Sequence, residues 1–134
     1  YYTTVDKFAF PGDSKSTLGT GLSVGRDGVT GMANSGTAGY FAGGYQFQGP
    51  NVSTVDKFAF SDDSRTTLST GLSTAVRFPA GMANSGVAGY VGGGYGTGQI
   101  TTVDKFAFSD DSRSTLGTGI SVAAGYLAAM ANGL

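Results

Sequence analysis

Short apolar segments separated by clusters of Gly, Asp and Ser recur along this chain. Residues 54–60, Thr-Val-Asp-Lys-Phe-Ala-Phe, are rich in β-branched and aromatic side chains and predict a strand. Their apolar positions fall on both faces, as expected of a strand in a sheet that is packed on both sides. The polar cluster at 61–64 predicts a turn, because Asp and Ser side chains bond their own nearby backbone.

Three more strands are predicted after this turn. Leu68 and Leu72 indicate a second strand, antiparallel to the first. Residues 81–83 predict a short buried strand, and 84–86, Asn-Ser-Gly, the hairpin turn after it, because Asn and Gly tolerate positive φ. Residues 88–93 predict a fourth strand, with small residues where another backbone comes close. The predicted unit is a four-stranded antiparallel meander of about 50 residues.

The first predicted strand occurs three times, beginning at Thr4, Thr54 and Thr102, with spacings of 50 and 48 residues. A fixed period of this size indicates a solenoid, a propeller or an array. We therefore treat residues 1–134 as a single repeat array, with repeat 1 at 4–53, repeat 2 at 54–101 and a truncated repeat 3 at 102–134. The start at Tyr1, without an initiator Met, indicates a processed or truncated N-terminus.

The order of features within a repeat resembles the kelch repeat, whose units are four-stranded blades of a β-propeller. The features are an aromatic-ended strand, an acidic turn, a Leu-bearing strand, an Arg, and a Tyr before a diglycine; the last three fall at Arg26 and Arg77, Tyr40 and Tyr90, and Gly43-Gly44 and Gly93-Gly94. The resemblance covers nearly the whole chain and implies an all-β fold in which this Arg is structural. The departures are the absence of the Trp that usually follows the acidic turn, and Gly125 in place of the third Arg. The repeats are also similar to tandem repeats of phage and microbial surface proteins.

About 2.7 repeats cannot close a ring of the four to eight blades that propellers have, so the ring is incomplete within this chain. Three explanations follow: further blades of a longer chain, self-association of two copies into a ring of roughly six blades, or open stacking into a filament. The first two are favoured, because an open blade exposes unpaired strand edges.

Composition and charge exclude several classes of function. Eight basic residues oppose nine acidic ones, all Asp, so no basic stripe for nucleic acid is present. The chain has neither Cys nor His, which removes thiolate and imidazole metal ligands. No apolar run approaches the roughly 20 residues of a membrane span. We expect no metal and no cofactor.

The recurring polar motifs are interpreted as structural. The Asp-Lys pairs at 6–7, 56–57 and 104–105 lie within strands, where adjacent side chains point to opposite faces, so they are no acid–base device. They are better explained as a polar network between units. The Asp-rich stretches at 62–64 and 110–112 lack a calcium-loop pattern and are predicted to be turns. The diglycines at Gly43-Gly44 and Gly93-Gly94 lack a P-loop context and indicate close backbone packing.

The loops differ most between the copies, at 45–52 and 95–100 and also at 25–30 and 75–79. Variation on a repeat scaffold collects on binding faces. The candidate partner-binding residues are Tyr45, Phe47, Arg77, Phe78 and Tyr95, because Tyr and Arg recur at interfaces. The competing interpretation is that they merely cover the blade ends. Asn51 begins an N-glycosylation sequon in the longest of these loops.

These observations favour a non-enzymatic structural or binding module. It would present its variable loops to a protein or glycan partner at a cell or virion surface, hence outside the cell. One alternative is a self-assembling subunit of an extracellular filament. The other is a fragment of a propeller enzyme, but the copper-dependent oxidases among kelch-like propellers use His, Tyr and Cys, two of which are absent here.

Overall fold

The computed structural model describes residues 1–131, and in this range the chain is all-β with no helix. It follows that no helix of this range could cross a membrane. The strands are, in chain order, β1 Asp6–Ala9, β2 Ser14–Thr17, β3 Thr30–Asn34, β4 Ala38–Ala42, β5 Val55–Ala59, β6 Arg65–Thr67, β7 Ala80–Asn84, β8 Ala88–Gly92, β9 Val103–Ala107 and β10 Arg113–Thr115.

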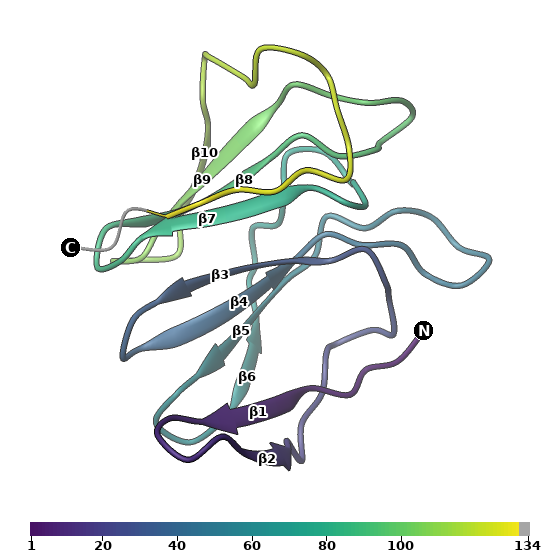
Figure 1. Cartoon of the computed structure of the whole chain (residues 1–134). Helices are drawn as coiled ribbons and strands as arrows, with labels where there is room; N and C mark the ends of the chain where they lie inside the picture. The colour runs from purple at the N-terminus through teal and green to yellow at the C-terminus, as the bar shows by residue number, and fades with distance from the viewer. Residues whose placement is uncertain (132–134) are drawn as a thin grey trace.

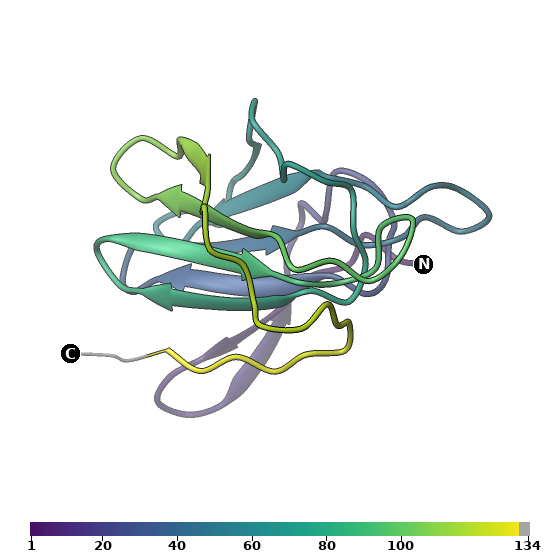
Figure 2. The same ribbon diagram turned by 90° about the horizontal axis from the view of Figure 1, so that it is seen from above.

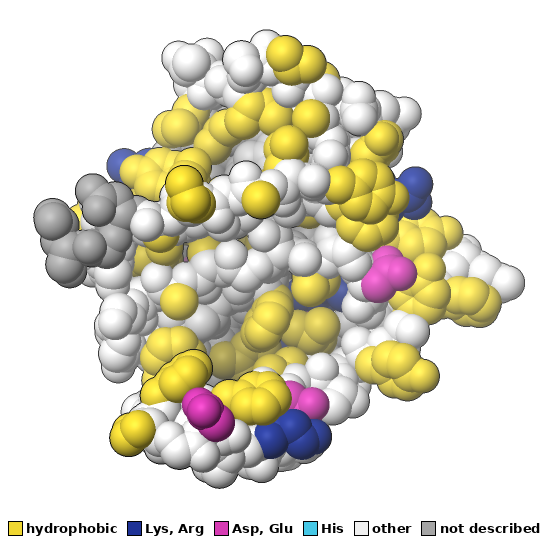
Figure 3. Space-filling model, in the orientation of Figure 1, with side chains coloured by type: hydrophobic (Ala, Val, Ile, Leu, Met, Phe, Trp, Pro, Cys, Tyr) yellow, Lys and Arg dark blue, Asp and Glu magenta, His cyan; other side chains and the backbone are white. Residues whose placement is uncertain are grey.

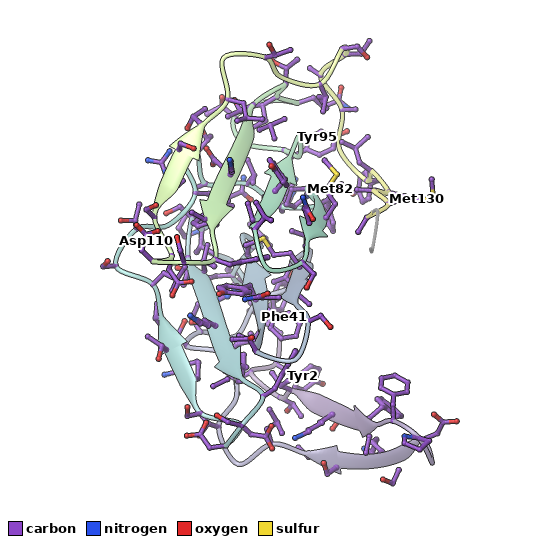
Figure 4. The ribbon with its side chains drawn as sticks, turned by 90° about the vertical axis from the view of Figure 1, so that its left-hand side faces the viewer. Tyr2, Phe41, Met82, Tyr95, Asp110 and Met130 are labelled. Atoms are coloured by element: carbon purple, nitrogen blue, oxygen red, sulfur yellow. The ribbon has the colours of Figure 1, made fainter. Side chains whose placement is uncertain are left out.

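The strands form three antiparallel units that follow one another along the molecule (Figures 1 and 4). The N-terminal hairpin is β1–β2, the central sheet has the order β3-β4-β5-β6, and the C-terminal sheet has the order β7-β8-β9-β10. Within each sheet, strands that follow one another in the sequence pair, so four-stranded antiparallel meanders are present, but the predicted grouping of the strands at 54–93 into one sheet is wrong because β6 and β7 belong to different sheets. Over residues 1–131 the units do not close into a ring.

The sheets are out of phase with the copies seen in the sequence. β4 pairs with β5 across the variable loop, with Ala42 opposite Val55, so the central sheet joins the end of the first copy to the start of the second. The link from β6 to β7, residues 68–79, instead passes from one sheet to the next. A sheet is therefore completed by residues of two copies. The last three residues of the third copy lie outside the described range.

The predicted strands at 54–60, 81–83 and 88–93 and the turn at 84–86 are confirmed, but the strand assigned to Leu68 and Leu72 was placed too far along the chain. The observed strand β6 ends at Thr67. The Leu68 amide still donates to the Val55 carbonyl at 2.9 Å, and there the ladder stops. Leu72 is buried because it packs between the units after the strand has ended.

The core lies between the sheets and is built mainly from the inner strands. Its buried members include Met32, Tyr40, Val55, Leu72, Val76, Val91, Phe106 and Phe108. In β5, the adjacent residues Val55 and Asp56 are both fully buried, so both faces of this strand are covered, as predicted. In β1, which has the same sequence, no residue is buried. Burial thus depends on which unit a strand occupies.

The strands β3 and β7 lie side by side where two sheets meet. A Cβ atom on Gly81 would collide with the carbonyl oxygen of Gly31. Glycine here permits the close approach of two backbones. The sheets consequently meet through their first strands, and the long loops project together beyond one end of the strands (Figure 2).

Candidate binding surface at the loop end

The loops that vary between copies are joined to one another at one end of the sheets (Figure 1). Tyr45 forms isolated β-bridges with Asp27 and Asn51, which ties the loop before β3 to the loop after β4. One unit later, Tyr95 forms the matching bridges with Arg77 and Gln99. The two loops of each unit therefore hold each other, and tyrosine occupies the same place in both.

A line of backbone hydrogen bonds connects the loops of successive units. The Phe78 amide donates to the Gly28 carbonyl at 2.7 Å, and the Tyr126 amide donates to the Phe78 carbonyl at 3.0 Å. These three residues have positive φ values of 62° for Gly28, 55° for Phe78 and 58° for Tyr126. A left-handed conformation is uncommon and strained in bulky aromatic residues. Phe78 and Tyr126 thus share this uncommon backbone conformation at equivalent positions of two successive units.

The aromatic side chains of these loops form two groups. Tyr1 contacts Tyr45 edge to face, with ring centroids 5.9 Å apart, and also Phe47 at 5.2 Å. Tyr126 stacks on Phe78 at 4.2 Å and contacts Tyr95 at 5.8 Å. We call these six aromatic residues, together with Arg77, the loop-end surface. Tyr126 is 72% exposed and Phe47 65% exposed, so much of its apolar area faces solvent.

Arg77 links the two aromatic groups. Its guanidinium lies 5.1 Å from the centroid of the Tyr45 ring and 5.9 Å from that of Phe78, distances typical of cation–π contact. Within residues 1–131 Arg77 has no salt bridge. At the edge of the surface, partial burial raises the pKa of the Tyr1 phenol, and the nearby Asp27 carboxylate raises it further. The surface thus combines exposed aromatic rings with a cation that forms no salt bridge to a carboxylate of the described residues.

Arg26 and Arg77, predicted to be equivalent, occupy different positions. Arg77 pairs with Tyr95 as Asp27 pairs with Tyr45, so Arg77 corresponds to Asp27 and not to Arg26. Arg26 is buried and donates to Asp56 Oδ2 at 2.9 Å and to the Phe41 carbonyl at 3.4 Å. These buried bonds to a carboxylate and a backbone carbonyl are typical of a structural arginine. The side chain of Arg77 instead lies on aromatic rings.

All five candidate contact residues belong to the loop-end surface. Sequence reasoning missed Tyr1 and Tyr126 as members. A signal for Tyr126 was present, because Gly125-Tyr126 in the third copy stands where Arg77-Phe78 stands in the second. No comparable signal marked Tyr1, since its contacts with Tyr45 and Phe47 arise only in the folded chain.

The sequon residue Asn51 lies beside the same surface. Its Nδ2 atom donates to the carbonyl oxygens of Tyr95 at 2.8 Å and Gly96 at 3.2 Å. Because a glycan would replace one hydrogen of this nitrogen, glycosylation would require at least one of these two bonds to break. Asn51 thus acts as a clamp between the two long loops in this structure.

The diglycines bring the loops close to the strands. A Cβ atom on Gly43 would lie 2.7 Å from the Val76 carbonyl oxygen, and one on Gly93 would lie 2.8 Å from that of Ala124. The Gly44 amide donates to the Val76 carbonyl at 2.8 Å, and the Gly94 amide to that of Ala124 at 2.7 Å. Each diglycine therefore docks one unit against the backbone of the next.

The Asp-rich turns and the Asp-Lys strands hold the units together. Asp62 accepts a bond from the amide of Ser64 in its own turn at 3.0 Å, while Asp63 accepts one from Lys7 of the preceding unit at 2.7 Å. Lys57 donates to Asp111 in the same way at 2.7 Å. These bonds confirm the predicted polar network between units. Among residues 1–131 there is no group of three acidic side chains placed to hold a metal ion.

A cavity of about 970 Å³ lies between the N-terminal hairpin and the central sheet, where hydrophobic side chains line a hollow (Figure 3). Its walls include Phe8, Phe10 and Phe60. Of the charged residues that line it, Lys7 and Asp63 are paired with each other, and Asp6 is paired with Lys15. This cavity accordingly offers apolar area and no arrangement of free acid, base and nucleophile.

A scan against protein-family models and a search of curated proteins gave no match to this chain. The assignment of a site therefore rests on the geometry described above.

Proposed function

We propose that this chain is a non-enzymatic binding module that contacts a protein partner through its loop-end surface. The observation that carries the proposal is the convergence of the variable loops into one exposed aromatic surface around Arg77, whose guanidinium lies on aromatic rings and has no salt bridge within residues 1–131. Tyr and Arg dominate the residues that contribute most to protein binding. Exposed apolar patches of this kind also mark protein–protein sites.

The rigid support of the surface agrees with this proposal. Phe78 and Tyr126 are fixed by bonds between units, and Asn51 clamps the loops after β4 and β8. Pre-organised side chains lose less conformational entropy on binding. Rigid aromatic anchors on variable loops, displayed by a constant scaffold, are also the general design of binding loops.

A kelch-like β-propeller is the architecture that we propose for the scaffold. Support comes from the four-stranded antiparallel meanders and from the contact between their first strands, β3 and β7, which matches blades arranged around an axis. An extracellular or virion-surface location is part of the same proposal. It rests on the resemblance to repeats of phage and microbial surface proteins.

The test uses two probes, a displayed library of random peptides and a glycan array, each applied to the folded chain. Peptides selected on the wild type should bind the Arg77→Ala variant roughly 30-fold more weakly, the loss typical of a dominant interface residue. Val87→Ala is the matched control, because Val87 is an exposed apolar residue at the hairpin turn between β7 and β8. It should leave binding unchanged. Phe47→Ala provides a second test of the surface, since its ring is largely exposed.

Equal binding of the selected peptides to the wild type, Arg77→Ala and Phe47→Ala would overturn the assignment of this surface. Glycan binding that depends on Arg77, without peptide binding, would replace the protein partner with a carbohydrate. Loss of binding in the Val87→Ala control would place the site at the opposite end of the strands.

A further inference from the structure

A cluster of four residues joins the central sheet to the C-terminal sheet. The Tyr40 hydroxyl and the Lys57 ammonium donate to the two carboxylate oxygens of Asp111, at 2.8 and 2.7 Å. The Tyr40 ring also stacks on Phe108, with centroids 5.3 Å apart. We call Tyr40, Lys57, Phe108 and Asp111 the junction cluster. Tyr and Lys come from one unit, and Phe and Asp from the next.

A second link repeats at the same junctions. Asp104 of the C-terminal sheet accepts bonds from the amide and hydroxyl of Ser73, at 2.7 and 2.9 Å. Asp56 of the central sheet accepts the same pair of bonds from Ser23, both at 2.9 Å. Each unit therefore offers a serine to the aspartate of the unit that follows it.

The N-terminal hairpin and the C-terminal sheet carry the halves of these links that have no partner unit within residues 1–131. Copies of the donor residues stand on the C-terminal unit, at Tyr90, Lys105 and Ser121. Copies of the acceptor residues stand on the N-terminal hairpin, at Phe10, Asp13 and Asp6. Within residues 1–131, none of these six side chains bonds to another unit. Asp6 bonds only to Thr17 and Lys15 of its own hairpin.

On the hairpin, the backbone of Asp13 already has the left-handed conformation that its counterparts have at the internal junctions. Asp13 has a φ of 51°, against 58° for both Asp63 and Asp111. No other unit covers this face of the hairpin in the described chain. Phe10 is therefore 86% exposed, whereas the corresponding Phe108 at the internal junction is 9% exposed. Burying a phenylalanine is worth roughly 1.5–3 kcal/mol, so covering Phe10 would favour association. β1 also has one edge that pairs with no strand of the described chain.

We infer that a second copy of this chain docks head to tail, with its N-terminal hairpin on the β8–β9 face of the first copy. Lys105 of one copy then bonds Asp13 of the other, Tyr90 stacks on Phe10, and Ser121 bonds Asp6. The opposite charges of Lys105 and Asp13, and the identity of residue types with the internal junction, specify this occupant. Because the two faces differ, the contact is heterologous and propagates to a ring or a filament. It is independent of the loop-end surface.

The test is an exchange of charges, followed by sedimentation equilibrium of the full chain. Asp13→Lys and Lys105→Asp each place like charges at the contact, and each variant alone should associate roughly a hundred-fold more weakly than the wild type. An equimolar mixture of the two should associate about as strongly as the wild type, because lysine at 13 then meets aspartate at 105. Phe10→Ser should weaken association without any change of charge.

Asp110→Lys is the control for net charge, since Asp110 bonds within its own exposed turn (Figure 4). It should leave association unchanged. Far-ultraviolet circular dichroism establishes that each variant is folded, and folding is expected because the side chains of Asp13 and Lys105 form no hydrogen bond or salt bridge within the described chain. A wild type that stays monomeric at its highest soluble concentration overturns the inference. So does association that both charge reversals leave intact, or a mixture no stronger than its components.

Discussion

The Asp56→Asn variant tests whether a buried polar link stabilises the fold. This link joins the central sheet to the loop that follows the N-terminal hairpin. Asp56 is fully buried and accepts four bonds, from Thr67 Oγ at 2.7 Å and from the Ser23 amide, Ser23 Oγ and Arg26 Nη2 at 2.9 Å each. Arg26 is also buried. The replacement preserves the size of the side chain and removes its charge, which leaves the guanidinium without a counter-ion.

Breaking a buried ion pair by removing one partner costs about 3–5 kcal/mol. That is a large share of the roughly 5–15 kcal/mol that stabilises an ordinary domain. The same change at Asp104 should cost less, because its arginine partner, Arg113, is 3.4 Å away and 25% exposed. At Asp6 the carboxylate is exposed and its ion pair with Lys15 is long, so Asp6→Asn should cause no resolvable change.

Urea unfolding followed by circular dichroism measures these three losses. The midpoint should fall most for Asp56→Asn, less for Asp104→Asn and not measurably for Asp6→Asn, with similar slopes. The three aspartates stand at one position of the repeat, so their sequence contexts are nearly identical. Equal losses at all three positions, or a loss below about 1 kcal/mol at Asp56, would refute the argument from burial.

Two further predictions concern the backbone and pH. Gly43→Ala should destabilise the fold by roughly 1–3 kcal/mol, because Gly43 has a φ of 69° and its Cβ would crowd the Val76 carbonyl; Gly98→Ala, where nothing lies within 4 Å, should be nearly neutral in the same urea assay. Burial acts to raise the pKa of Asp56, but the bonds from Thr67 and Ser23 and the charge of Arg26 lower it overall. The stability from Asp56 is therefore present above the unfolded value of about 3.9 and lost as pH falls through the lower folded value. Melting temperature should change little between about pH 5 and 8, since the chain has no His, and fall in acid less steeply for Asp56→Asn than for the wild type. A transition near pH 6.5, or an acid limb that Asp56→Asn leaves unchanged, would contradict this.

Most of the strands and turns could be predicted because their signals are local. The Asp-rich turns bond their own backbone, and the residues Asp13, Asp63 and Asp111 adopt nearly the same φ in three different surroundings. The exception, β6, was misplaced because Leu68 and Leu72 were taken as strand residues, whereas they pack after the ladder ends. Regularly spaced leucines indicate buried positions, and a residue can be buried without belonging to a strand.

The candidate site was predictable only in part. Variation between copies selected Tyr45, Phe47, Arg77, Phe78 and Tyr95, and the fold brings all five to one surface. Variation could not show that Arg26 turns inward while Arg77 lies on aromatic rings. The difference of one position was present in the sequence, since Arg26 follows Ser23 by three residues and Arg77 follows Ser73 by four, and the bridges align Arg77 with Asp27.

The sequence by itself determined the repeating unit, its antiparallel strands and its turns, because each depends on residues within a few positions of one another. Only the tertiary structure decided which copy of each residue is buried and what it bonds. Phe10, Phe60 and Phe108 each end the same segment, Thr-Val-Asp-Lys-Phe-Ala-Phe, yet their exposed fractions are 86%, 44% and 9%. The physical reason is that desolvation and ion pairing depend on the unit stacked alongside, which no local pattern encodes.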